Sequence, residues 1–124
     1  MKLASFMKGG KATYGGILDD RAVDLAPRFG GQYQDLRALI AGGGQVGLAP
    51  FTATGEDWTA LQVVEFLPVI PNPGKIVCIG INYADHQKEM GRAKAGYPTI
   101  FLRYPDTLVG HGQAAWIPKV STKV

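Results

Sequence analysis

The chain has 124 residues, of which 46% are hydrophobic and 19% charged, and this balance excludes a disordered acidic tail and a membrane protein. No apolar run reaches the roughly 18 residues that a membrane-spanning helix needs, and Lys8 interrupts the N-terminus before a secretory signal could form. The net charge of +3 comes from basic residues scattered singly, which disfavours nucleic-acid binding. We therefore expect a cytoplasmic globular protein with no nucleic-acid or membrane partner.

The N-terminal residues 2–26 show the pattern of a small antiparallel β-sheet. Polar and apolar residues mix at short period in three segments, with Gly9-Gly10 and Asp19-Asp20 between them as turn residues. A sheet of three short strands needs a partner layer to be stable. The strands are predicted at residues 2–7, 13–18 and 22–25.

A short amphipathic helix is predicted over residues 33–41. Leu36, Leu39 and Ile40 recur there at helical spacing, and the glycine run 42–44 ends the pattern as a C-terminal cap and flexible link. The sequence then becomes rich in turns and gives little periodic signal up to residue 60.

The strongest interruption in the sequence is Pro71-Asn72-Pro73-Gly74, which marks the organisational boundary. After it, residues 75–81 (KIVCIGI) are nearly all apolar, as expected for a strand covered on both faces, and residues 98–103 (PTIFLR) form a second such strand. Between these strands, residues 82–91 are polar and have the length of a helix. The predicted domains are a small N-terminal β-domain over residues 1–67 and a second domain over residues 68–124.

The C-terminal residues 116–124 still show an alternating β-pattern where the sequence stops. A natural domain seldom ends in a strand whose pairing partner has not appeared. We therefore expect the 124 residues to be the front part of a longer polypeptide.

His86 and Glu89 are the strongest candidates for chemistry. They are three residues apart, so they share one face if residues 83–90 are helical, and this helix would directly follow a buried strand. A carboxylate beside an imidazole raises the basicity of the ring and fixes its tautomer, as a general base acting on water requires. By spacing alone, a solvated helix face with a minor ion pair is the more common arrangement.

Three other features give weaker signals. His111 lies between two glycines, and the favoured interpretation is an exposed loop residue. Arg103 ends the second apolar strand, where its guanidinium either holds an anionic substrate group or reaches solvent or a carboxylate. No metal site can be completed from the sequence, because His86, His111 and Cys78 lie far apart and few carboxylates are near His86.

The segment KIVCIGINYADHQKEMGRAKAGYPTIFLRYPDTLVGHGQ carries a motif of several parts: a strand ending in Gly-x-Asn-Tyr, a His-x-x-Glu helix, and a Pro-x-x-Phe segment leading to a glycine-containing turn. It resembles the opening of the catalytic domain in the fumarylacetoacetate hydrolase family, over about residues 68–118. Residues 1–67 resemble the small N-terminal β-domain of bacterial members. The resemblance implies a mixed, β-rich α+β fold, in which a β-meander domain precedes the start of a β-roll catalytic domain.

The resemblance also implies a function. Members are metal-dependent hydrolases that use Mg²⁺ or Mn²⁺ and cleave a carbon–carbon bond in an acylpyruvate-like or fumarylpyruvate-like 2-oxo acid from aromatic-compound catabolism. Isomerases and decarboxylases share the same front motif, so these activities stay open as alternatives. A catalytically inert, truncated scaffold is a further alternative. Because members commonly pair their catalytic domains, we expect a homodimer.

The resemblance assigns roles residue by residue. His86 matches the general base that activates water, and Glu89 matches its partner in the dyad. Asn82 and Tyr83 match positions that line the substrate pocket, and Arg103 stands where many members have a lysine that contacts substrate. No metal ligand can be named, because the family's acidic ligands would begin where this sequence ends. The chain is therefore either the front part of a full-length enzyme or a shortened relative without metal-dependent chemistry.

Overall fold

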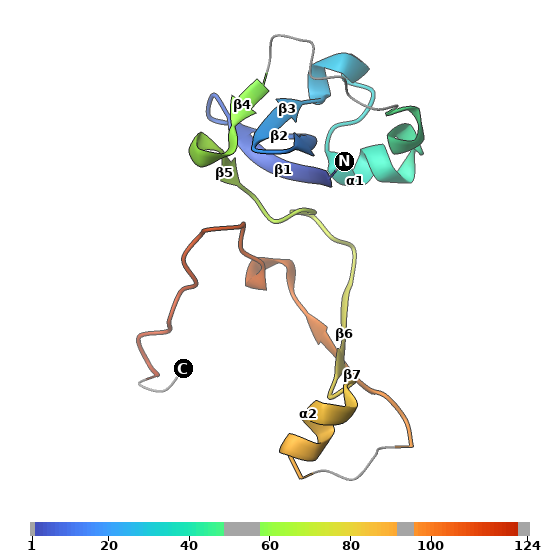
Figure 1. Ribbon diagram of the computed structural model, residues 1–124, viewed down its shortest axis with the longest axis vertical. Coiled ribbons are helices and arrows are strands. Elements are labelled where there is room, and N and C mark those ends of the chain that lie inside the picture. Colours follow the sequence, from blue (N-terminus) through green and yellow to red (C-terminus); the bar gives the residue numbers. More distant parts are fainter. Residues whose placement is uncertain (1, 49–57, 92–95, 122–124) are drawn as a thin grey trace. The chain divides into compact units, whose positions relative to one another are not determined.

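The computed structural model describes residues 2–48, 58–91 and 96–121, with Ala84, His86 and Gln87 described by their backbone alone (Figure 1). The chain divides into two compact units. Unit 1 comprises Met1–Asn72 and Leu108–Val124, and unit 2 comprises Pro73–Thr107. The domain limits predicted from the sequence, 1–67 and 68–124, stay a prediction. Within the described residues, no helix is long and apolar enough to cross a membrane.

A five-stranded antiparallel sheet forms the centre of unit 1, in the order β4-β3-β2-β1-β5 (Figure 1). The first three strands are the predicted meander, which is confirmed. The tight turn between the first two strands depends on Gly9 and Gly10, whose φ angles of 56° and 76° suit glycine and few other residues. The strands are β1 (Lys2–Lys8), β2 (Lys11–Leu18), β3 (Arg21–Asp24), β4 (Trp58–Ala60) and β5 (Glu65–Phe66).

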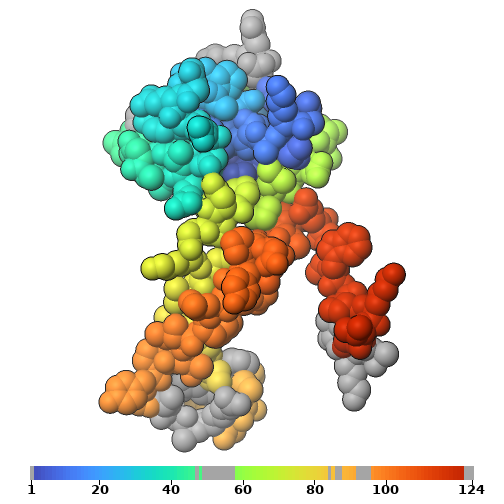
Figure 2. Space-filling view, turned by 180° about the vertical axis from the view of Figure 1, so that it is seen from behind, coloured from blue at the N-terminus to red at the C-terminus, as the bar shows by residue number. Residues whose placement is uncertain are grey.

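Both faces of this sheet bury apolar side chains. Ala22 and Val23 are neighbours on β3, so they point to opposite faces, and each belongs to a different buried cluster. Helix α1 (Leu36–Ala41) contributes Leu36 and Leu39 to the cluster of Val23. Figure 2 shows the side chains of the N-terminal residues, from blue to cyan, packed closely together. The remaining helical turns are the 3₁₀ segments η1 (Ala26–Phe29), η2 (Gly44–Gly47) and η3 (Leu61–Val63).

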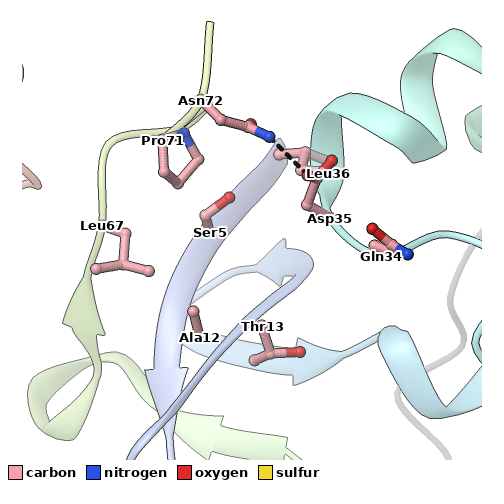
Figure 3. A pocket seen from close by; sticks show the side chains of 9 residues that line it. All are labelled: Ser5, Ala12, Thr13, Gln34, Asp35, Leu36, Leu67, Pro71 and Asn72. Atoms are coloured by element: carbon pink, nitrogen blue, oxygen red, sulfur yellow. Dashed lines mark hydrogen bonds between the residues drawn. The ribbon is translucent and has the colours of Figure 1, made fainter. Parts of the chain in front are cut away.

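Helix α1 begins later than the predicted residue 33, because Asp35 caps it. The Asp35 carboxylate accepts a hydrogen bond of 2.7 Å from the Ala38 backbone N–H, the standard N-cap interaction. Its second oxygen accepts from Asn72 Nδ2 at 2.8 Å (Figure 3), and Arg37 donates to the Asn72 carbonyl at 3.0 Å. The chain is therefore held to α1 at the point where it leaves unit 1.

Unit 2 contains a two-stranded antiparallel sheet of β6 (Ile76–Gly80) and β7 (Thr99–Arg103). The predicted strands and the helix between them are confirmed. The predicted cover on both faces is wrong for the described chain, because the side chains on one face are 52–69% exposed. The reason is that the described part of unit 2 adds to this strand pair only a six-residue helix, α2 (Ala84–Glu89), and a 3₁₀ turn, η4 (Pro105–Thr107). The exposed face comprises Val77, Ile79, Ile100 and Leu102.

After unit 2 the chain returns to unit 1 through a turn beside β5. The buried Gly110 lies against the Phe66 carbonyl, which a Cβ atom at this position would strike, and its N–H donates to Gln113 Oε1 at 2.8 Å. The β-pattern predicted for residues 116–124 is wrong over 116–121, where the described chain contains no strand. Trp116 and Val120 are exposed there, and residues 122–124 lie outside the described residues.

Candidate functional site

The chain bends sharply between β6 and α2. Ile81 has a φ angle of 53°, in the left-handed region that a β-branched residue rarely adopts. Such local strain is common at functional sites, where the surrounding structure maintains it. Sequence reasoning missed this feature, because Ile81 reads as the last residue of an apolar strand. The bend ends the strand and directs the next residues into the helix (Figure 1).

Helix α2 places positions 86 and 89 on the same side of its axis. They are one helical turn apart, which is the spacing of facing neighbours on an α-helix. Glu89 is exposed, and the description of His86 is limited to the backbone. The pair is thus placed by the backbone as the spacing predicts, and its catalytic role stays a prediction.

Asn82 and Tyr83 lie between the Ile81 bend and α2, and both are exposed. Arg103 lies at the end of β7, opposite Ile76 on β6. The structure therefore places Asn82 and Tyr83 beside the helix, whereas Arg103 lies at the other end of the strand pair. Their predicted contact with substrate stays a prediction.

Arg103 lines a cavity of about 260 Å³ within unit 2. Lys75 and Tyr104 line the same cavity, together with Pro73, Gly74 and Pro105. Within the described chain, neither Lys75 nor Arg103 forms an ion pair. Two cations beside an aromatic ring suit an anionic group such as a carboxylate.

Lys75 is a site candidate that sequence reasoning missed. Its signal lies in strand register: the antiparallel pairing sets Ile76 opposite Arg103, so the residue before β6 comes next to the end of β7. The two cations are 28 positions apart in the sequence, and their proximity follows only once the pairing is known.

A divalent metal ion does not fit the residues that the structure describes. Among them, no group of three or more His, Cys, Asp or Glu side chains comes together. Asp85 and Glu89 are the acids on α2, and hard divalent cations need several oxygen ligands around one point. Cys78 lies half-buried on β6 as a free thiol.

Comparison with known proteins finds similarity to one enzyme family. Residues 75–124 match the family model described as fumarylacetoacetate (FAA) hydrolase C-terminal. An uncharacterized protein of Archaeoglobus fulgidus is 33% identical over 64 residues, which cover 52% of this chain and 25% of that protein. Human mitochondrial oxaloacetate tautomerase FAHD2A is 36% identical over 61 residues, covering 49% of this chain and 19% of the enzyme. The chain thus spans a quarter or less of the length of these relatives.

A solved structure supports the fold. The crystal structure of a putative HpcE protein from Mycobacterium smegmatis matches 95% of this chain and 41% of that chain, with a TM-score of 0.73 and 22% sequence identity. The predicted mixed, β-rich fold is therefore confirmed. The family match covers residues 75–124, which include the Gly-x-Asn-Tyr and His-x-x-Glu motifs, so this part of the chain is similar to the fumarylacetoacetate hydrolase family.

Proposed function

We propose that the protein containing this chain hydrolyses a carbon–carbon bond in an acylpyruvate-like or fumarylpyruvate-like 2-oxo acid, with His86 and Glu89 as its acid–base pair. The observation that carries the proposal is the placement of positions 86 and 89 on one face of α2, directly after the strained Ile81. Similarity to this family supports an enzyme, since the named relatives include oxaloacetate tautomerases. Aromatic-compound catabolism is the proposed source of the substrate.

In this proposal the imidazole of His86 removes a proton from water, and the resulting hydroxide attacks the carbonyl next to the bond that breaks. The Glu89 carboxylate accepts a hydrogen bond from the second ring nitrogen, which fixes the tautomer and stabilises the imidazolium. The electron pair of the broken bond passes to the 2-oxo acid as an enolate, which then takes up the proton. General-base assistance of this kind contributes about 10²- to 10⁴-fold to a rate.

The cavity that Arg103 and Lys75 line lies at the other end of the strand pair from α2, so it is the proposed site for a carboxylate at the end of the substrate remote from His86. A guanidinium can donate two parallel hydrogen bonds to a carboxylate, and a nearby ammonium adds positive charge. Asn82 and Tyr83 are proposed to contact the rest of the substrate. Mg²⁺ or Mn²⁺ also belongs to the proposal as a cofactor of the whole protein, although the described residues supply no ligand set and none of these steps depends on it.

Keto–enol tautomerisation of a 2-oxo dicarboxylic acid is the second candidate. The human, rat, frog and bovine relatives named as oxaloacetate tautomerases favour it. The same imidazole would then move a proton between substrate carbon and solvent, and no water would attack. The two reactions share the enolate and differ in whether a carbon–carbon bond breaks.

The experiment compares the native protein with His86→Ala and with Lys88→Ala, an exposed neighbour on the same helix. It uses the whole protein to which the 124 residues belong, supplied with Mg²⁺, and follows loss of an acylpyruvate and enol–keto exchange of oxaloacetate by ultraviolet absorbance. We expect His86→Ala to lower the turnover at least 100-fold with an unchanged circular dichroism spectrum. Lys88→Ala should retain activity. Near-native turnover in His86→Ala would overturn the catalytic assignment.

We also propose a cytoplasmic location and a homodimer for the whole protein. Cell fractionation tests the location, and the mitochondrial location in the names of the mammalian relatives sets the alternative outcome. Light scattering coupled to gel filtration tests the dimer, and a mass equal to one polypeptide would contradict it.

A further inference from the structure

Unit 1 contains a groove of about 380 Å³ that the proposed function does not use. The groove lies beside β1 and β5, and the returning segment after residue 107 forms one of its walls. Its volume is in the range of sites that take small organic ligands. Residues that line it include the apolar Leu3, Ile17, Phe66 and Val109 and the basic Lys2 and His111.

Two glycines shape the turn that carries His111. Gly110 is pressed against the Phe66 carbonyl, and its N–H is bonded to the Gln113 side chain at 2.8 Å. Gly112 has a φ angle of 77°, a conformation that glycine adopts without strain. The sequence Gly-His-Gly thus reflects two backbone requirements of the turn that places His111 beside Phe66.

His111 itself lies at the groove. Its ring meets the Phe66 ring edge to face, with centroids 5.8 Å apart and planes at 80°. Its side chain and that of Lys2 are exposed, and within the described chain neither forms a hydrogen bond or an ion pair. A neutral imidazole keeps one N–H donor, and an ammonium offers three donors and no acceptor. Both groups are therefore available to an acceptor that enters the groove.

The charge of the lining selects the kind of ligand. The residues that line the groove include two basic side chains and no acidic one, and the others are apolar. A ligand that complements this surface has an apolar body and one negatively charged, hydrogen-bond-accepting end. We propose that this groove binds a small amphipathic monocarboxylate, with its carboxylate at Lys2 and His111 and its apolar chain over Leu3, Ile17 and Val109.

The experiment titrates the 124-residue chain with octanoate, below its micelle-forming concentration, and follows methyl signals by nuclear magnetic resonance. We expect saturable one-to-one binding, with shifts at the methyl groups of Leu3, Ile17 and Val109. The methyl groups of Leu36 and Leu39, which do not line the groove, should stay in place. Octanamide, which has the same chain without the charge, should bind at least fivefold more weakly.

Three variants locate the carboxylate. Lys2→Gln and His111→Gln should each weaken octanoate binding about threefold, as expected for an exposed charged or polar contact. Lys11→Gln removes an exposed positive charge outside the groove and should leave binding unchanged. The proposal is overturned if octanoate does not saturate, if octanamide binds equally well, or if Lys2→Gln and His111→Gln bind octanoate like the native chain. The outcome is separate from the proposed function, because neither residue belongs to the His86–Glu89 pair.

Discussion

Units 1 and 2 differ in how far they bury their apolar side chains. Unit 1 encloses its own core, in which Tyr14, Leu25, Leu36 and Leu39 are almost completely buried. Unit 2 has a strand pair with one aliphatic face in solvent, and such a pair is at best marginally stable by itself. The residues of the candidate catalytic site all lie in unit 2. The segment that encloses its own core and the segment that contains the candidate catalytic residues are therefore different parts of the chain.

The largest effect that can test this comparison comes from paired core truncations. Leu39→Ala in unit 1 should lower the free energy of unfolding by about 3 kcal/mol, because it leaves a cavity around a side chain with no exposed surface. Ile79→Ala in unit 2 removes a side chain that is 52% exposed and should lower it by less than about 1 kcal/mol. Urea unfolding of the 124-residue chain measures both. Equal losses would contradict the difference between the units.

A smaller effect is expected from Gly110→Ala. The added methyl group would strike the Phe66 carbonyl, so the turn must shift, at a cost of about 2 kcal/mol. Gly96→Ala in unit 2 is the matched control, because a Cβ atom there meets nothing within 4 Å. Amide hydrogen exchange should rise at Gly110 and Gln113 in the first variant and stay unchanged in the second. If Gly110→Ala has native stability and exchange, the return segment is not anchored at β5.

The smallest expected effect concerns the cap of α1. The pKa of Asp35 lies below its ordinary value of 3.8. The hydrogen bond from the Ala38 N–H is the largest cause, and the hydrogen bond from the Asn72 side chain and the positive charge of Arg37 lower the pKa further. Since the pKa is lower in the folded state, the carboxylate stabilises unit 1 above pH 3.8, and this contribution is lost as the pH falls through the folded-state pKa. Asp35→Ala should therefore lower the free energy of unfolding by about 1 kcal/mol at pH 7.

The pH series provides the check on this prediction. The difference in stability between the native chain and Asp35→Ala should shrink as the pH falls from 7 toward 3. Asp35→Asn keeps a capping oxygen without the charge, so it should retain most of the stability at pH 7 and show less dependence on pH. A native-to-Ala difference that is constant over the whole range would show that the charge of Asp35 contributes nothing.

Local patterns predicted the fold of unit 1 well. Alternation along the chain and the pair Gly9-Gly10 fix strands and a turn between near neighbours, and the three-stranded meander followed from them. The start of α1 was misplaced, because the side chain of Asp35 caps the helix more effectively than the residues before it extend it. The strands β4 and β5 pair with β3 and β1 over long sequence separations, which no local pattern specifies.

Burial in unit 2 was predicted less well than secondary structure. The apolar run around Cys78 predicted a strand correctly. The burial of that strand depends on which other segments pack against it, and the composition of the run does not specify those segments. The shared helix face of positions 86 and 89 followed from spacing alone. The strain at Ile81 and the closeness of Lys75 to Arg103 depend on a dihedral angle and on strand register, so they required the structure.

The chain leaves unit 1 at Asn72, where Asp35 and Arg37 hold it, and comes back at Gly110 beside Phe66. For unit 1, the residues between these two attachment points form one long loop whose two ends are fixed. The entropic cost of closing such a loop grows only with the logarithm of its length, by about 0.6 kcal/mol for each doubling. Evolution can therefore lengthen, shorten or rewrite the part that carries His86 and Arg103 while the N-terminal sheet folds almost as before.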